Sequence, residues 1–283
     1  MSGTELIIIY MSSYFSYKFF KLWYGSSFDS WPPERVKLIR NIFMALPVIS
    51  SLIILFTLGA LASFDVVGDP VYILFYLLMG FAWIYFSLTI TSLLFDISWI
   101  DDGLNLANKA VLPPVAGSFL AATVIYSGAN IGDGPGWWCV VFAGGLGMWT
   151  WFALCLIINK FANIFERITV ERDIGCGTRI GGYLLGSGII LGRASAGDWT
   201  SFGMTTIEFM DGWPVLFLAL LVLVIEIYYI SKSEMDYGDY RSNLPASAFL
   251  SIFYVIFSIA IVIALPSIKY TGLYSNILKL FVS

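Results

Sequence analysis

The sequence contains no histidine, only three cysteines and few charged residues. The missing histidine removes the side chain that proteins use most often as a metal ligand and as a general base near neutral pH. The three cysteines form no C-x-x-C pair, which is the spacing typical of zinc and iron–sulfur sites (Cys139, Cys155 and Cys176). We therefore expect no metal and no cofactor, and a protein that is not an enzyme.

Charge is scarce while apolar residues are abundant. Charged residues make up 12% of the 283 residues, hydrophobic residues make up 59%, and the mean hydropathy is +0.84. A soluble domain has about 25% charged residues. A chain as apolar as this one cannot cover its surface with polar groups in water. We therefore expect a membrane protein whose principal partner is the lipid bilayer. The net charge of −4 also argues against nucleic acid as a partner.

Long apolar runs predict the helices that cross the membrane. A helix needs about 20 apolar residues to cross the hydrocarbon core. Seven segments meet this requirement: Ile42–Phe64, Val71–Phe95, Val111–Asn130, Trp137–Asn159, Ile180–Ala196, Trp213–Ser231 and Ala246–Pro266. An eighth, Leu6–Tyr24, is interrupted by Lys18 and Lys21, and it either crosses the membrane or lies at the interface. The expected fold is an all-α polytopic membrane protein with about eight transmembrane helices, or seven if the first segment is interfacial.

A polar residue that leads into an apolar run recurs four times along the chain. These repeat anchors are separated by 67, 65 and 70 residues (Asn41, Asn108, Asp173 and Asn243). Asn or Asp before a helix accepts hydrogen bonds from its first free N–H groups, so we expect each anchor to cap the helix that follows. The chain then forms one membrane domain, residues 1–283, of four tandem helical hairpins. The hairpins cover about 5–64, 71–130, 137–197 and 212–268, and this count favours a first segment that crosses the membrane.

The basic residues predict the orientation. Lys and Arg concentrate at the end of the first segment and in linkers near 25–40, 96–110, 160–179 and 231–245, which places these linkers in the cytoplasm. Arg179 is counted among these linker residues. Tryptophans at both boundaries are typical of aromatic belts, with Trp23, Trp31 and Trp99 on the inner side. We expect a multi-pass protein of the cell inner (plasma) membrane.

Two stretches carry a resemblance to a known family. The stretches "DDGLNLANKAVLPPVAGSFLAA" and "ITVERDIGCGTRIGGYLLGSGIIL" pass from polar residues through an anchor into small residues. They resemble the bacterial inner-membrane family called domain of unknown function 350 (YjfL-like), over about Tyr72–Gly197. The hairpins at Asn41 and Asn243 look like diverged copies on both sides, while Asp173 replaces the usual Asn. The family has no established activity, so the resemblance implies tandem hairpins and an inner-membrane address.

Three ionisable residues are candidates for an intramembrane polar site, because a charge within lipid is energetically costly and commonly has a functional role. Glu226 lies inside "LVLVIEIYYISK" and serves either an ion pathway or a salt bridge to a neighbouring helix. Asp96 lies at the cytoplasmic boundary, where it is solvated or caps a helix. Arg193 lies near the outer end of its helix, where its side chain reaches the interface and can pair with Asp198.

Two functions remain open at this stage. The first is a non-catalytic scaffold or accessory subunit of a larger or homo-oligomeric membrane assembly. The alternative is an ion or small-solute channel or transporter that uses Glu226, which the prolines inside apolar runs would also suit (Pro47 and Pro113–Pro114). Successive hairpins insert in the same orientation, unlike the inverted repeats of many transporters, so we favour the scaffold.

Overall fold

The computed structural model describes residues 2–29, 33–235 and 243–265, which form helices with no β-strand. Seven helices in these ranges are long and apolar enough to cross a membrane. They are α2 (Pro33–Ala60), α4 (Pro70–Phe95), α5 (Leu112–Ala129), α6 (Trp137–Ala162), α8 (Ile174–Ala194), α10 (Val215–Met235) and α11 (Leu244–Ala264). The prediction of an all-α polytopic membrane protein is confirmed.

Another long helix and several short elements complete the described structure. Helix α1 (Gly3–Asp29) carries Lys18 and Lys21 and is not one of the seven apolar helices. It packs along α4 and touches α2 where the Trp23 indole donates a hydrogen bond to the Phe43 carbonyl, 2.9 Å away. The short elements are α3 (Phe64–Val67), a π-helix η1 (Trp99–Asn105), α7 (Ile164–Thr169), α9 (Phe202–Phe209) and a 3-10 turn η2 (Met210–Gly212).

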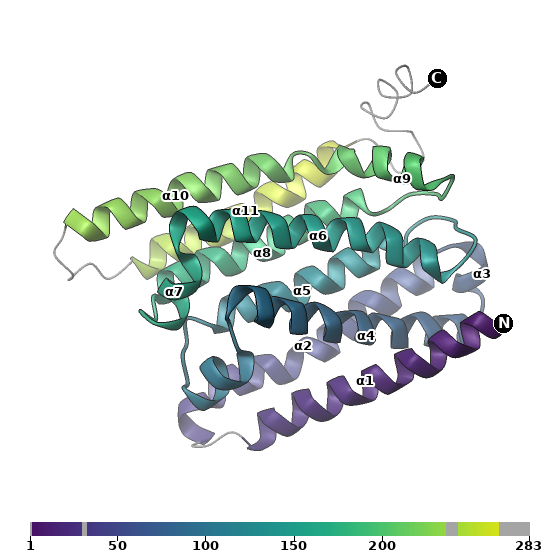
Figure 1. Ribbon diagram of the computed structural model, residues 1–283, viewed down its shortest axis with the longest axis horizontal. Helices are drawn as coiled ribbons and strands as arrows, with labels where there is room; N and C mark the ends of the chain where they lie inside the picture. The colour runs from purple at the N-terminus through teal and green to yellow at the C-terminus, as the bar shows by residue number, and fades with distance from the viewer. Residues whose placement is uncertain (1, 30–32, 236–242, 266–283) are drawn as a thin grey trace.

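The long helices form two rows, and one row lies behind the other in the view of Figure 1. In one row α1 packs on α4, α4 on α6, and α6 on α10. In the other row α2 packs on α5, α5 on α8, and α8 on α11. The chain alternates between the rows as it crosses from one end of the bundle to the other. Tandem hairpins would produce this alternation, although the internal repeat itself stays a prediction.

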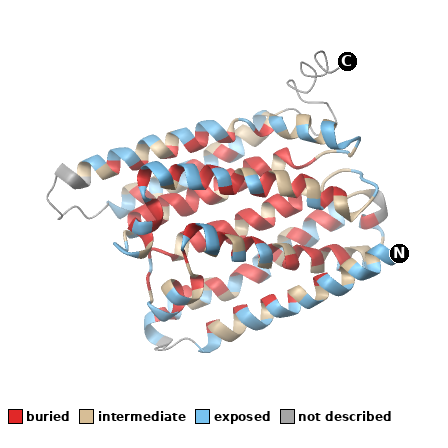
Figure 2. Ribbon diagram, in the orientation of Figure 1, coloured by how far each residue is buried: buried red, intermediate tan, exposed pale blue. Residues whose placement is uncertain are grey.

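The second row is held together by very close backbone contacts. A Cβ atom added at Gly117 would collide with the Gly181 carbonyl, and one at Gly128 would collide with the Gly192 carbonyl. Small residues of this kind let membrane helices approach closely, because apolar side chains gain little from leaving lipid. Helix α8 is consequently the most buried of the seven, with 78% of its most apolar stretch buried against 17% for α11 (Figure 2).

Two predictions about individual residues are wrong. Helix α2 begins at Pro33, so Asn41 lies inside it and caps nothing, because Pro33 and Glu34 already provide a favourable first turn. The inner tryptophan belt also fails for two of its members. Trp23 and Trp99 are buried and pack against each other with ring centroids 4.2 Å apart, so they join the core rather than the headgroup region. Trp31 lies outside the described residues.

Candidate functional site

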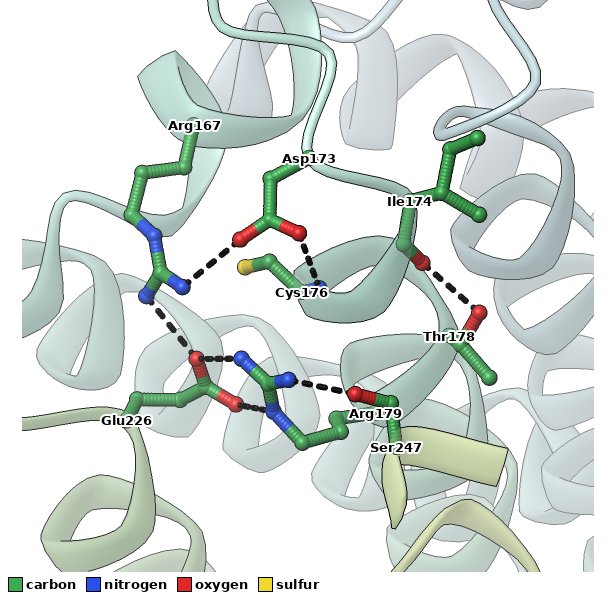
Figure 3. A network of polar contacts seen from close by, with 8 residues as sticks. All are labelled: Arg167, Asp173, Ile174, Cys176, Thr178, Arg179, Glu226 and Ser247. Atoms are coloured by element: carbon green, nitrogen blue, oxygen red, sulfur yellow. Dashed lines mark hydrogen bonds and ion pairs between the residues drawn. The ribbon is translucent and has the colours of Figure 1, made fainter. Parts of the chain in front are cut away.

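Glu226 of α10 is fully buried and lies at the centre of a polar network (Figure 3). The Glu226 network consists of Arg167, Asp173, Arg179, Glu226 and Ser247. These residues come from α7, the start of α8, α8, α10 and α11 respectively. The network therefore joins α7, α8, α10 and α11 at one point.

Arg179 makes the closest contacts of this network. Its Nε donates to Glu226 Oε1 at 2.5 Å and its Nη2 donates to Glu226 Oε2 at 2.8 Å, which is a two-pronged arginine–carboxylate pair. Its Nη1 donates to the Ser247 hydroxyl of α11 at 2.7 Å. The guanidinium carbon also lies 3.8 Å from the centre of the Tyr229 ring. Such a planar, fully paired guanidinium is suited to burial in a way that a lysine ammonium is not.

Arg167 extends the network to the N-terminal end of α8. Its Nη1 donates to Glu226 Oε2 at 2.9 Å, and its Nη2 donates to Asp173 Oδ2 at 2.9 Å. The other oxygen of Asp173 accepts a hydrogen bond from the backbone N–H of Cys176, 3.0 Å away, and so caps α8. Two guanidinium groups therefore face two carboxylates, and the network as a whole is neutral.

The neutrality explains how these charges can be buried. An ion taken out of water loses several kcal/mol of hydration, and the loss is offset only where every charge has well-placed partners. In this network each oxygen of Glu226 accepts from an arginine, and oxygen Oε2 accepts from two. What the arrangement can do is fix α7, α8, α10 and α11 relative to one another. Glu226 does not line any of the three cavities described below.

Arg167, Arg179 and Ser247 are site residues that the sequence reasoning missed. Arg179 was assigned to the cytoplasmic linker near 160–179, but α8 begins at Ile174 rather than at Ile180. The cap formed by Asp173 is the signal that could have placed it. A helix that starts directly after Asp173 carries Arg179 five residues, or about 8 Å, into the bundle. An arginine at that depth needs a buried carboxylate, and Glu226 was the available one.

The remaining anchors have different roles. Asn243 caps α11, because its side-chain oxygen accepts from the Ala246 N–H at 3.2 Å. Asn108 lies before Val111, the residue that precedes α5, and its oxygen accepts from the Ala110 N–H at 3.0 Å. Its amide nitrogen donates to the Ile168 carbonyl of α7 at 2.9 Å. Asn108 thus tightens its own turn and ties it to the neighbouring linker.

Asp96 and Arg193 lie apart from this network. Asp96 is exposed and ends α4 in the left-handed conformation, with φ of 50°. Arg193 is half-buried at the C-terminal end of α8, and the carboxylate that acts on it is that of Asp211 rather than the expected Asp198. Asp198 accepts a hydrogen bond from the Asp133 N–H instead. Burial raises the pKa of the Asp211 carboxyl, while the charge of Arg193 lowers it.

Several cavities lie elsewhere in the described part of the chain, among them the following three. One of about 50 Å³ lies between the loops at 131–136 and 195–199, and includes Asp133, Asp198 and Glu208 in its lining. A second, of about 10 Å³, lies under η1. The third, of about 230 Å³, lies between α1, α4 and η1. Among the described residues, no three His, Cys, Asp or Glu side chains are grouped so that they could hold a metal ion.

Comparisons with known proteins give no match, whether to a protein-family model, to a curated protein or to a solved structure. The resemblance to domain of unknown function 350 therefore stays a prediction that rests on the two quoted stretches.

Proposed function

We propose that this chain is an eight-span protein of a bacterial inner membrane that acts as a scaffold or accessory subunit of a membrane assembly. The observation that carries the proposal is that the Glu226 carboxylate is fully occupied by partners within the Glu226 network. The strongest candidate for an ion-binding carboxylate is engaged by Arg179 and Arg167, and its side chain has no exposed surface. These contacts serve helix association, which is what a structural subunit requires.

The alternative function, a channel or transporter that uses Glu226, needs a carboxylate that water or an ion can reach. In the described structure both oxygens of Glu226 face guanidinium N–H groups at 2.5–2.9 Å. A cation at Glu226 would have to displace one or both arginines, and each displaced guanidinium would then lie unpaired in a low-dielectric interior. This cost argues for the scaffold.

The eight-span topology follows from the length and position of α1. From Gly3 to Trp23 the helix covers about 30 Å, the thickness of the hydrocarbon core. It contacts α4 near its start, through Glu5 with Tyr72, and it contacts η1 near its end, through Trp23 with Trp99. With α1 across the membrane, the linkers near 25–40, 96–110, 160–179 and 231–245 share one side. Their Lys and Arg residues make that side the cytoplasm.

The edge formed by α10 and α11 is the surface that we assign to partner subunits or to a second copy of this chain. α11 is the least buried of the seven apolar helices, and large apolar side chains cover its outer face. On α11 these are Phe249, Ile252, Ile256, Ile259 and Ile263, and on α10 they are Leu216, Leu220, Val224 and Ile227. The Glu226 network holds these two helices on α8 and so shapes this edge.

Purification of the full chain in mild detergent, followed by native mass measurement, tests the proposal. We expect a mass above the 31.5 kDa of one chain, from further copies or from co-purifying membrane proteins. Ile256→Ser on the outer face of α11 should reduce the larger species. The matched control Leu52→Ser, at an equally exposed apolar position on α2, should leave it unchanged.

A folded protein that always has the mass of one chain would contradict the scaffold. Equal loss of the larger species in both variants would contradict the assignment of the α10–α11 edge.

A further inference from the structure

The cavity of about 230 Å³ between α1, α4 and η1 is the largest of the three described cavities, and it opens toward the lipid-facing surface. Its walls are apolar and aromatic, with Phe19 and Leu22 from α1 and Leu88 and Leu93 from α4. The buried pair Trp23 and Trp99 closes its inner end. Leu22 and Leu93 are 44% and 79% exposed, so the surrounding bilayer reaches the opening.

The cavity lies at the cytoplasmic boundary of the bilayer. Trp23 is level with Phe43 of α2, to whose carbonyl it donates a hydrogen bond. The basic residues of α2 precede Phe43 by one to two turns and mark the headgroup side (Arg35, Lys37 and Arg40). The end formed by Ser98 and Trp99 therefore faces the headgroups, while Phe19 and Tyr85 face the hydrocarbon.

Hydroxyl groups line the same cavity. Thr89, Ser92 and Ser98 all contribute to its surface. The Thr89 and Ser98 hydroxyls donate to neighbouring oxygens, Tyr85 O and Asp101 Oδ2 respectively. In the described structure the half-buried Ser92 hydroxyl has no hydrogen-bond partner, so it remains able to donate to a ligand oxygen. A mostly apolar cavity with a few hydroxyls at its headgroup end suits the acyl chain and ester oxygens of a lipid.

A positively charged side chain, that of Lys18, lies near the opening. Lys18 is exposed on α1, one turn before Leu22, and its ammonium lies 4.7 Å from the centre of the Tyr14 ring. Among the described residues it has no carboxylate partner. Its ammonium is directed toward Tyr14, one turn nearer the N-terminus, and it also interacts electrostatically with Tyr85, which lines the cavity. The four-carbon side chain of Lys18 is flexible enough to turn from there toward the cytoplasmic headgroups. Neither Lys18 nor Lys21 lines the cavity itself, and Lys21 is equally exposed.

We propose that this cavity binds one anionic phospholipid of the cytoplasmic leaflet. One acyl chain fills the cavity, an ester or phosphate oxygen accepts from Ser92, and Lys18 pairs with the phosphate. The occupant is a lipid because the opening faces the bilayer, and it is anionic because the Lys18 ammonium beside the opening has no carboxylate partner among the described residues. The site rests on the eight-span topology proposed above, and it is independent of the scaffold role.

Native mass spectrometry of the full chain with defined lipids tests the site. The probes are phosphatidylglycerol and phosphatidylcholine with identical acyl chains, added at equal concentration. We expect one phosphatidylglycerol to be retained about five- to tenfold better than phosphatidylcholine. Lys18→Gln should abolish this preference, and the matched control Lys21→Gln should keep it. Ser92→Trp, which fills the cavity, should reduce retention of both lipids.

Equal retention of the two lipids by the unmodified chain would overturn the proposal, as would an equal loss of preference in both lysine variants. A reporter at Ser2 separates this failure from failure of the topology. If the reporter lies outside and the chain shows no lipid preference, the lipid site alone is contradicted. If the reporter lies in the cytoplasm, the topology and the lipid site are both contradicted.

Discussion

The Glu226 network makes a quantitative prediction about the stability of the bundle. Glu226→Leu removes the carboxylate that both arginines face, and it leaves Arg179 buried with Ser247 as its remaining hydrogen-bond partner. Arg179→Met removes the opposite charge, and it leaves Glu226 with Arg167 alone. The double variant removes both, while Arg167 keeps its pair with Asp173.

The magnitudes follow from the burial of the pair. Both side chains are 0% exposed, so each single variant leaves the neutral network with one unbalanced charge where water cannot reach it. Breaking a buried ion pair in this way costs about 3–5 kcal/mol of the free energy of unfolding. Replacing the whole pair with apolar groups of similar size is often neutral. We therefore expect each single variant to lose about 3 kcal/mol or more, and the double variant to lose less than either.

The assay is reversible unfolding of the purified chain in mixed micelles, with the four proteins compared as a double-mutant cycle. Glu166→Gln is the control, because Glu166 is an exposed acid of α7 close to the network along the chain and should change the free energy of unfolding by about 0.5 kcal/mol or less. Single variants that are as stable as the original chain would refute the reasoning. Losses that simply add in the double variant would refute it as well, because independent sites do not couple.

Three further predictions concern packing, capping and orientation. Gly128→Ala should lower the midpoint of thermal unfolding in detergent, because its Cβ would meet a backbone carbonyl of α8, whereas Gly145→Ala should not, because nothing lies within 4 Å; equal effects would contradict the close contact. Asn108→Asp should destabilise the chain by roughly 1–3 kcal/mol in chemical unfolding, because the amide that donates to α7 becomes an oxygen, and an unchanged stability would contradict this role. Single cysteines at Gly134 and Glu171 should react with a membrane-impermeant thiol reagent from opposite sides, and labelling from one side would contradict the topology.

Hydropathy alone was sufficient to predict the class of fold. The requirement for about 20 apolar residues is a length set by the bilayer, so α4, α5 and α6 end within three residues of the predicted spans. The starts of two helices were harder to predict. Helices α2 and α8 begin before the apolar runs, because a polar first turn is stable wherever caps or water form hydrogen bonds with its free backbone N–H groups.

The candidate site was only half predictable for the same reason. Glu226 is conspicuous because it interrupts an apolar run, and a salt bridge was one of the two roles expected for it. Arg179 has polar and glycine neighbours in "DIGCGTRIGG", so nothing in its local composition places it in the interior. Its burial depends on where α8 begins and on how closely glycines let α8 approach α5 and α11, which are properties of the folded bundle.

Ion flux into liposomes is the measurement that tests the central claim most directly, namely that Glu226 holds helices together and does not carry ions. The unmodified chain and the Glu226→Leu/Arg179→Met double variant are reconstituted at equal density. We expect no proton, potassium or sodium flux above that of empty vesicles from either protein. Reproducible flux through the unmodified chain that disappears in the folded double variant would contradict the account and favour a channel.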